Sequence, residues 1–152
     1  MNKTIIRLKD KVSSELYTRL NEQRVLHLHL KRKWYDMIVS REKREEYRLI
    51  TDYWCNRFLY QTEKWSTFES ISYLLNSPSV YGNPESVMEH LNYMFKIFDL
   101  IVFENGYGDV PVAITEWDGI EIKKGKQEWG AVPGENYFTI LIGDLLYYES
   151  KN

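Results

Sequence analysis

The sequence predicts an α+β protein, with helices mainly in the first two-thirds and a small barrel-like sheet of five or more strands. Residues 24–31 alternate between apolar and polar side chains, a pattern typical of a strand. Residues 98–149 hold several extended segments separated by short turns. The strand–helix–strand rhythm of a parallel α/β fold is not present in the pattern.

Composition favours one compact domain over residues 1–152. Hydrophobic residues make up 43% of the chain and aromatic residues 15%, enough for a core and for flat side chains that line a pocket. This composition argues against disorder. The net charge of −2 means that a nucleic-acid binder would need its Lys and Arg residues concentrated on one face.

Cys55 is the single cysteine, so the sequence allows no internal disulfide and no cysteine-based zinc site. The first twenty residues are too charged for a signal peptide, and no apolar run reaches the length of a membrane span. We therefore expect a soluble, cytoplasmic protein in a reducing compartment, with no membrane association, cofactor or metal.

Residues 4–22 carry apolar side chains at helical spacing, which predicts an amphipathic packing helix; a partner-binding helix is the alternative. In strand 24–31, the leucines at 26, 28 and 30 face one side, while Val25, His27, His29 and Lys31 face the other. A short helix over 33–40 follows, with Trp34, Met37 and Ile38 on one side.

The polar run 40–48 returns to extended character, and residues 52–60 predict a helix capped by Asp52 and packed through Trp54, Phe58 and Leu59. Residues 61–97 read as a helical insertion, with helices near 66–76 and 84–96. Extended segments follow at 98–108, at 110–125 in two pieces, and at 128–149 in one or two. The Trp129-to-Gly134 segment predicts a barrel-closing turn.

Lys43, Glu46 and Arg48 are the strongest candidates for a functional site. In an extended segment Glu46 and Arg48 share a face and can form an ion pair, and Lys43 in the preceding turn can reach the same place. Such a group binds a planar polar ligand or an anion. On composition alone, a solvated turn is the simpler interpretation.

The segment 26–48, LHLHLKRKWYDMIVSREKREEYR, followed by YWCNRFL, resembles the ASCH superfamily, whose fold is a PUA-like β-barrel. Lys43, Glu46 and Arg48 match the family signature G-x-K-x-x-E-x-R, while Arg41 stands at the glycine position. Later segments resemble bacterial and phage members. Helix 4–22 and the insertion 61–97 look like additions to the minimal domain. A glycine at position 41 suggests a positive φ, so Arg41 there implies strain or a different turn.

The resemblance implies an RNA-associated domain with its pocket lined by the signature residues. Some members resemble amidohydrolases that remove an acyl group from N4 of a modified cytidine, and others have ribonuclease activity attributed to them. In the deacylating members a threonine stands where this chain has Glu46, and Thr51 is the nearest threonine. Without it, Lys43 could act as a base with Glu46 orienting water.

Other residues have weaker signals. His27 and His29 without a third ligand make a poor metal site, and a pocket-lining or hydrogen-bonded role for one of them is the better interpretation. Trp34, Tyr53, Trp54 and Tyr107 can stack on a base or pack in the core. Asn105 and Gly106 form a turn that can present backbone groups to a ligand, and an ordinary hairpin is equally plausible. Cys55 is most simply a buried small residue.

The sequence therefore predicts an RNA- or nucleotide-binding ASCH domain. The alternatives are a hydrolase of an acylated nucleoside or of RNA, with Lys43 and Glu46 catalytic, and a protein-interaction module that docks a partner through the added helices. The expected ligand-binding residues are Lys31, Trp34, Lys43, Glu46, Arg48, Tyr53, Asn105 and Tyr107.

Overall fold

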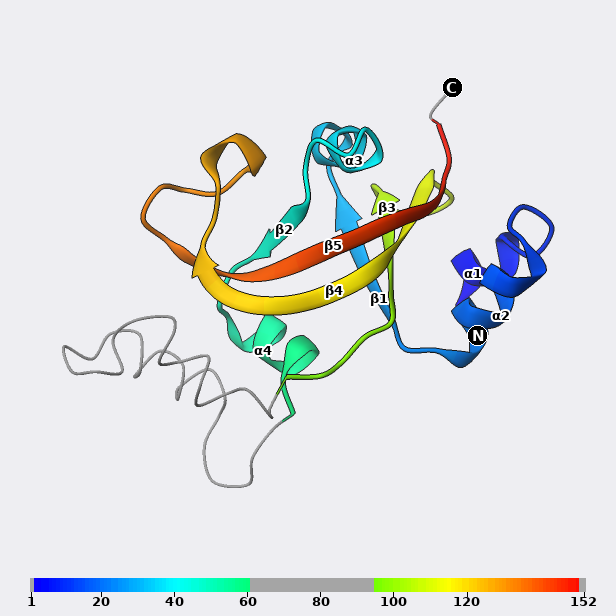
Figure 1. Cartoon of the computed structure of the whole chain (residues 1–152), viewed down its shortest axis with the longest axis horizontal. Helices are drawn as coiled ribbons and strands as arrows, with labels where there is room; N and C mark the ends of the chain where they lie inside the picture. Colours follow the sequence, from blue (N-terminus) through cyan, green and yellow to red (C-terminus); the bar gives the residue numbers. More distant parts are fainter. Residues whose placement is uncertain (1, 61–94, 151–152) are drawn as a thin grey trace. The chain divides into compact units, whose positions relative to one another are not determined.

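A computed structural model describes residues 2–60 and 95–150 of the chain (Figure 1). The predicted helix near 66–76 and nearly all of the one predicted over 84–96 lie outside these residues. The helices are α1 (Lys3–Arg7), α2 (Ser14–Glu22), α3 (Arg32–Val39), α4 (Asp52–Phe58) and the 3₁₀ turn η2 (Gln127–Trp129). The strands are β1 (Val25–Leu30), β2 (Glu45–Arg48), β3 (Leu100–Asn105), β4 (Val112–Lys124) and β5 (Asn136–Tyr148).

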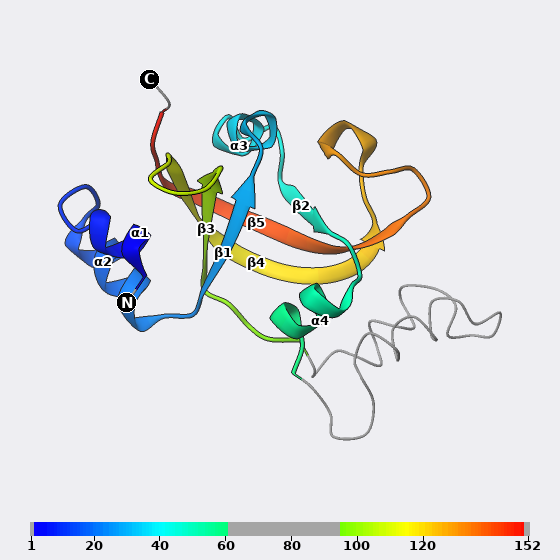
Figure 2. The same ribbon diagram turned by 180° about the vertical axis from the view of Figure 1, so that it is seen from behind.

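The five strands pair in the order β1-β3-β4-β5-β2 (Figure 2). β1 and β3 are parallel, whereas β3 pairs with β4 and β2 pairs with β5 in antiparallel register. The α+β class and the five-stranded sheet are as predicted. The parallel β1–β3 pair was not expected, because the two strands lie far apart in the sequence. Closure into a PUA-like barrel remains a prediction.

The chain divides into two compact units. The first unit comprises Met1–Arg44, Ile97–Asp118 and Ile142–Asn152, and the second comprises Glu45–Lys96 and Gly119–Leu141. Strands β4 and β5 contribute residues to both units.

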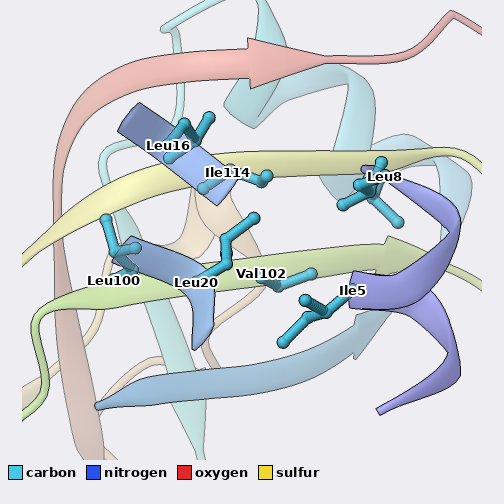
Figure 3. Close-up of a cluster of buried hydrophobic side chains, with 8 residues drawn as sticks. Ile5, Leu8, Leu16, Leu20, Leu100, Val102 and Ile114 are labelled. Atoms are coloured by element: carbon cyan, nitrogen blue, oxygen red, sulfur yellow. The ribbon is translucent and has the colours of Figure 1, made fainter. Parts of the chain in front are cut away.

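In the first unit, α1 and α2 cover one face of β3 and β4 (Figure 3). The predicted helix over 4–22 is wrong as a continuous element, because α1 ends at Arg7 and α2 begins at Ser14. The Ser13 side chain caps α2 by accepting from the backbone N–H of Leu16. The apolar stripe is nevertheless buried in a core cluster formed by Ile5, Leu8, Leu16, Leu20, Leu100, Val102, Val112 and Ile114.

Strand β1 confirms the alternating pattern. Leu26, Leu28 and Leu30 are buried, while His27 is partly exposed and His29 is exposed. The register with β3 places His29 beside Glu104 and Leu30 beside Asn105. Because side chains alternate along both strands, His29 and Glu104 share the face that α1 and α2 cover.

Helix α3 and the turn after it also belong to the first unit. Tyr35 and Ile38 are the buried residues of α3, and they define its packed side. Trp34 and Met37 are only partly buried. Arg41 has a φ of 70°, so the backbone adopts at this position the left-handed conformation that the glycine of the signature suggested.

In the second unit, α4 begins after Thr51. The Thr51 hydroxyl accepts from the backbone N–H of Trp54, so Thr51 and not the predicted Asp52 is the cap. Phe58 of α4 is fully buried and lies edge-on to Phe138 of β5. The predicted packing of Phe58 and Leu59 is therefore confirmed.

The segments predicted over 110–125 and 128–149 are each one strand of 13 residues in the structure. The prediction of two extended pieces over 110–125 is wrong, because β4 is continuous from Val112 to Lys124. Asp118-Gly119 is a dipeptide typical of turns, but the strand continues through it with a φ of 128° at Gly119. The 3₁₀ turn η2 ends at Trp129, and Gly130 and Gly134 follow it at positive φ; a barrel-closing role for this segment remains a prediction.

Within the described part of the chain, no helix is both long enough and apolar enough to cross a membrane.

Candidate functional site

Lys43 of the first unit is the most unusual of the predicted site residues, because its side chain is completely buried. Lysine is almost never fully buried unless it has a partner, since an unpaired buried charge is costly. Its backbone N–H donates to the carbonyl of Met37 at 2.9 Å, which fixes the turn after α3. Its ammonium nitrogen lies 5.6 Å from the ring centroid of Trp34. A cation over an indole face is a favourable pair.

Glu46 and Arg48 of the second unit form the predicted ion pair. The Glu46 Oε1 atom lies 3.5 Å from Nη1 of Arg48, and both side chains are largely buried. The same oxygen accepts from the backbone N–H of Tyr47 at 2.9 Å. The guanidinium carbon of Arg48 lies 5.1 Å from the ring centroid of Trp54. Arg48 is thus held between a carboxylate and an indole ring, which fixes the plane of its guanidinium group.

Tyr47 anchors β2 in this unit. Its hydroxyl donates to the Glu45 carboxylate at 2.8 Å and accepts from the backbone N–H of Lys126 at 2.9 Å. Burial is the main cause that raises the pKa of Tyr47, and it also opposes ionisation of Glu45. Hydrogen bonds from Lys123 and Tyr47 outweigh that burial and lower the pKa of Glu45. This network holds the strand that carries Glu46 and Arg48.

The second unit also carries exposed aromatic rings beside cations. Tyr53 is 58% exposed and lies edge-on to Trp54, with 4.8 Å between the ring centroids. Arg57 donates to the Tyr53 hydroxyl at 3.2 Å and lies 5.9 Å from the Trp54 ring. We call Arg48, Tyr53, Trp54 and Arg57 the α4 cluster. It combines stacking surfaces with positive charge.

The remaining predicted residues are more scattered. Lys31 is exposed at the N-cap of α3. Tyr107 is 79% exposed, and its ring stacks on that of His29, with 4.1 Å between centroids. Asn105 ends β3 beside Leu30 and is 9% exposed. The Asn105 Nδ2 group has no hydrogen-bond acceptor among residues 2–60 and 95–150, so a buried donor is left for a ligand or water.

The structure therefore brings Lys43 together with Trp34, and Glu46 together with Arg48 and Trp54. The first pair lies in one unit and the second group in the other. Their convergence in one pocket remains a prediction.

A cleft of about 500 Å³ in the first unit contains residues that sequence reasoning did not single out. Thr4 and Glu104 are such residues, and His27 and His29 also line it. A pocket-lining role for one of the histidines, one of the two roles predicted from the sequence, agrees with this position. Glu104 was missed because it sits within an apolar strand, LIVFEN, and a charged residue in such a run is the signal that could have identified it. The residues that the structure describes contain no group of three side chains suited to hold a metal ion.

The described residues define an α+β protein with a five-stranded mixed sheet, a buried lysine near an indole ring, and the α4 cluster, whose cations and aromatic rings come from β2 and α4. Comparison with protein-family models, with curated proteins and with solved structures found no match to this chain. The resemblance to the ASCH superfamily therefore remains a prediction that rests on the sequence.

Proposed function

We propose that this protein binds RNA or a nucleotide-like ligand through Lys43, Glu46 and Arg48, with aromatic side chains as stacking surfaces. The observation that carries the proposal is the α4 cluster. Arg48 is oriented by Glu46 and Trp54, and Tyr53 exposes more than half of its surface beside Arg57. Proteins that bind single-stranded nucleic acid combine aromatic rings for the bases with cations for the backbone.

The acceptor and donor chemistry of the candidate residues supports the same ligand class. A carboxylate such as Glu46 accepts from the exocyclic amine of a base, and a planar guanidinium such as Arg48 donates to a phosphate or a carbonyl. The buried amide of Asn105, whose Nδ2 group has no acceptor in the described residues, adds a donor in the first unit. An indole beside Lys43 offers a further flat surface.

The experiment is a titration of a labelled single-stranded RNA of mixed sequence, followed by fluorescence anisotropy at several salt concentrations. We expect the affinity to fall with salt, because phosphate contacts release counterions. Arg48→Ala should weaken binding by about tenfold and reduce the salt slope by roughly one unit. Lys43→Met, which keeps the buried volume, should also weaken it.

Arg32→Ala is the matched control, because Arg32 is an exposed arginine of α3 that forms an ion pair with Asp36 of the same helix. It should bind RNA like the unaltered protein. If the Arg48→Ala and Lys43→Met variants both bound RNA with the affinity of the unaltered protein, the site assignment would be wrong. Incubation with N4-acetylcytidine addresses the hydrolase alternative, since turnover that disappears in Glu46→Gln would favour that reading over simple binding.

A further inference from the structure

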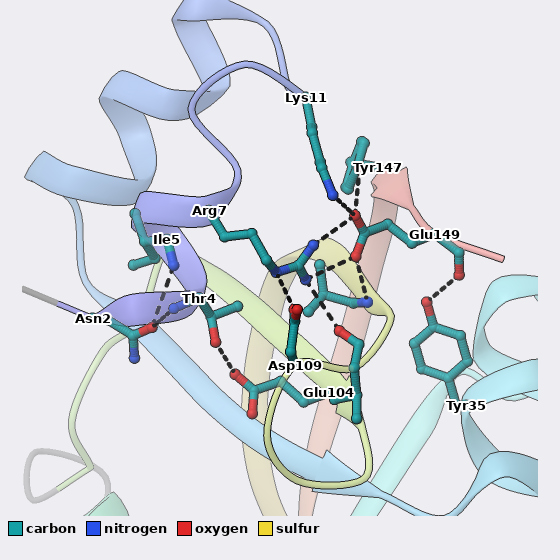
Figure 4. Close-up of polar contacts among 12 residues, drawn as sticks. Asn2, Thr4, Ile5, Arg7, Lys11, Tyr35, Glu104, Asp109, Tyr147 and Glu149 are labelled. Carbon is teal, nitrogen blue, oxygen red and sulfur yellow. Dashed lines mark hydrogen bonds and ion pairs between the residues drawn. The ribbon is translucent and has the colours of Figure 1, made fainter. Parts of the chain in front are cut away.

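The cleft of the first unit is independent of the proposed RNA site and has a different chemistry. Glu104 is one of the residues that line it, and its side chain is 8% exposed. Figure 4 shows the Glu104 carboxylate beside Thr4. The Thr4 hydroxyl donates to Oε1 of Glu104 at 2.9 Å, and Nδ1 of His29 lies 3.0 Å from Oε2. His27 is more distant, with 4.0 Å between its Nδ1 atom and Oε1.

The tautomer of His29 follows from its two acceptors. Nδ1 lies 2.8 Å from the carbonyl oxygen of Gly106 and 3.0 Å from the Glu104 carboxylate. Because both of these atoms are acceptors, Nδ1 of His29 carries a proton and donates toward them. The stacked ring of Tyr107 holds the imidazole in this orientation.

Among the residues that the structure describes, Glu104 forms ion pairs with the two histidines and with no lysine or arginine, so it has no permanently charged cation beside it. The two lysine and arginine side chains that line the cleft do not supply one. Arg7 is engaged by the carboxylates of Glu149 and Asp109, at 2.9 and 3.1 Å. Lys3 is exposed and makes no ion pair with Glu104. A buried carboxylate is stabilised far better by a positive charge than by neutral donors alone.

We propose that this cleft is a second ligand site, which binds a small organic cation, a guanidinium or an ammonium group, against the Glu104 carboxylate. The cleft is open enough for a small molecule. Thr4 and His29 orient the carboxylate, and the cation supplies the missing positive charge.

The test compares methylguanidinium with methylurea, which has a similar planar shape and no charge, and with ethylammonium and inorganic phosphate. Each compound is titrated into the full-length protein at neutral pH, and binding is followed by NMR through the imidazole signals of His27 and His29. We expect the two cations to shift these signals saturably, and methylurea and phosphate to leave them unchanged.

Two variants and a control assign the binding to the cleft. Glu104→Gln keeps the shape and removes the charge, so methylguanidinium should bind about tenfold more weakly or not at all. Thr4→Phe keeps Glu104 and fills the cleft from α1, so methylguanidinium binding should be lost in this variant as well. It tests the site even if Glu104→Gln does not fold. Glu22→Gln removes an exposed carboxylate of α2 and should bind like the unaltered protein.

Three results would overturn the proposal. The first is equal binding of methylurea and methylguanidinium, and the second is unchanged binding in both Glu104→Gln and Thr4→Phe. The third is a doubly protonated His29 imidazole at neutral pH without ligand, seen in its ¹⁵N shifts, because an imidazolium would already supply the cation.

Discussion

The guanidinium group of Arg41 donates a hydrogen bond to the carbonyl oxygen of Gly143, with 2.6 Å between Nη2 and the oxygen. This contact ties the turn after α3 to strand β5 within the first unit. Arg41 is also the one non-glycine residue with a positive φ in the described part of the chain. The side-chain bond is therefore made from a backbone conformation that glycine adopts readily and that L-residues other than asparagine and aspartate rarely adopt.

The two contributions of Arg41 can be separated by two substitutions. Arg41→Ala loses the hydrogen bond and keeps the strained φ, so the free energy of unfolding should fall by about 1–2 kcal/mol. Arg41→Gly loses the same bond but relieves the strain, and should be more stable than Arg41→Ala by about 1 kcal/mol. Urea denaturation followed by far-UV circular dichroism measures both.

Arg44 is the matched control for this pair. It also donates to a carbonyl of β5, that of Ile142, but does not have a positive φ. Glycine there should be less stable than alanine, the reverse of the order at position 41. The same order at both positions would contradict the assignment of strain to Arg41.

The carboxylate of Glu149 makes the stability of the first unit depend on pH. Burial raises the pKa of Glu149, but hydrogen bonds from Arg7, Tyr147 and the backbone N–H of Val112 outweigh it, and the net pKa is lowered. A carboxyl group with a lowered pKa in the folded state adds stability above about pH 5, and this stability is lost as the pH falls. We expect the free energy of unfolding to fall between about pH 5 and pH 3.

Glu149→Gln removes the titrating group, so its stability should depend less on pH over this interval while being lower at neutral pH. Chemical denaturation at a series of pH values gives the slope. Glu22→Gln, at an exposed position of α2, should keep the slope of the unaltered protein. An unchanged slope in Glu149→Gln would show that other carboxyl groups cause the acid sensitivity.

Cys55 of α4 should be chemically inert in the folded protein. It is 1% exposed, and burial raises the pKa of its thiol to about 12. Because the thiolate is the reactive form, iodoacetamide at mildly alkaline pH should modify the folded protein very slowly and the unfolded protein readily. Mass spectrometry with and without guanidinium chloride measures the difference, and rapid labelling of the folded protein would contradict the burial of this face of α4.

The proposed RNA site predicts that Tyr53 contributes to binding by stacking. Tyr53→Ala should weaken RNA binding by about 1–3 kcal/mol if one base stacks on this ring. Tyr148→Ala is the control, because Tyr148 is an exposed tyrosine at the end of β5, with 51% of its surface exposed. Fluorescence anisotropy compares the two, and equal losses would indicate that neither ring is a specific stacking surface.

The sequence was most informative where a regular period carries the signal. The alternation of Leu26, Leu28 and Leu30 identified β1, and the burial of Ile5 and Leu20 agrees with the predicted packing stripe. Continuity was harder to predict. Ser13 caps a new helix and so divides the predicted continuous helix in two. Gly119 allows β4 to continue through a dipeptide that is typical of turns.

The candidate site was predictable in type but not in environment. Glu46 and Arg48 share a face because a strand has a period of two residues, and their ion pair follows from that. The complete burial of Lys43 could not be predicted, because lysine is normally exposed and its burial depends on residues distant in the sequence. The contacts of Glu104 with Thr4 and His29 likewise depend on chain segments that only the tertiary fold brings together.

The parallel pairing of β1 with β3 has a consequence for folding during synthesis. Val25 pairs with Leu100, so β1 leaves the ribosome long before its partner strand does. Contacts this distant in sequence form slowly, and the apolar side chains of β1 remain exposed until β3 has been made. Arg7 of α1 binds Glu149, which follows β5, so this contact of the first helix forms only after β5 has been made.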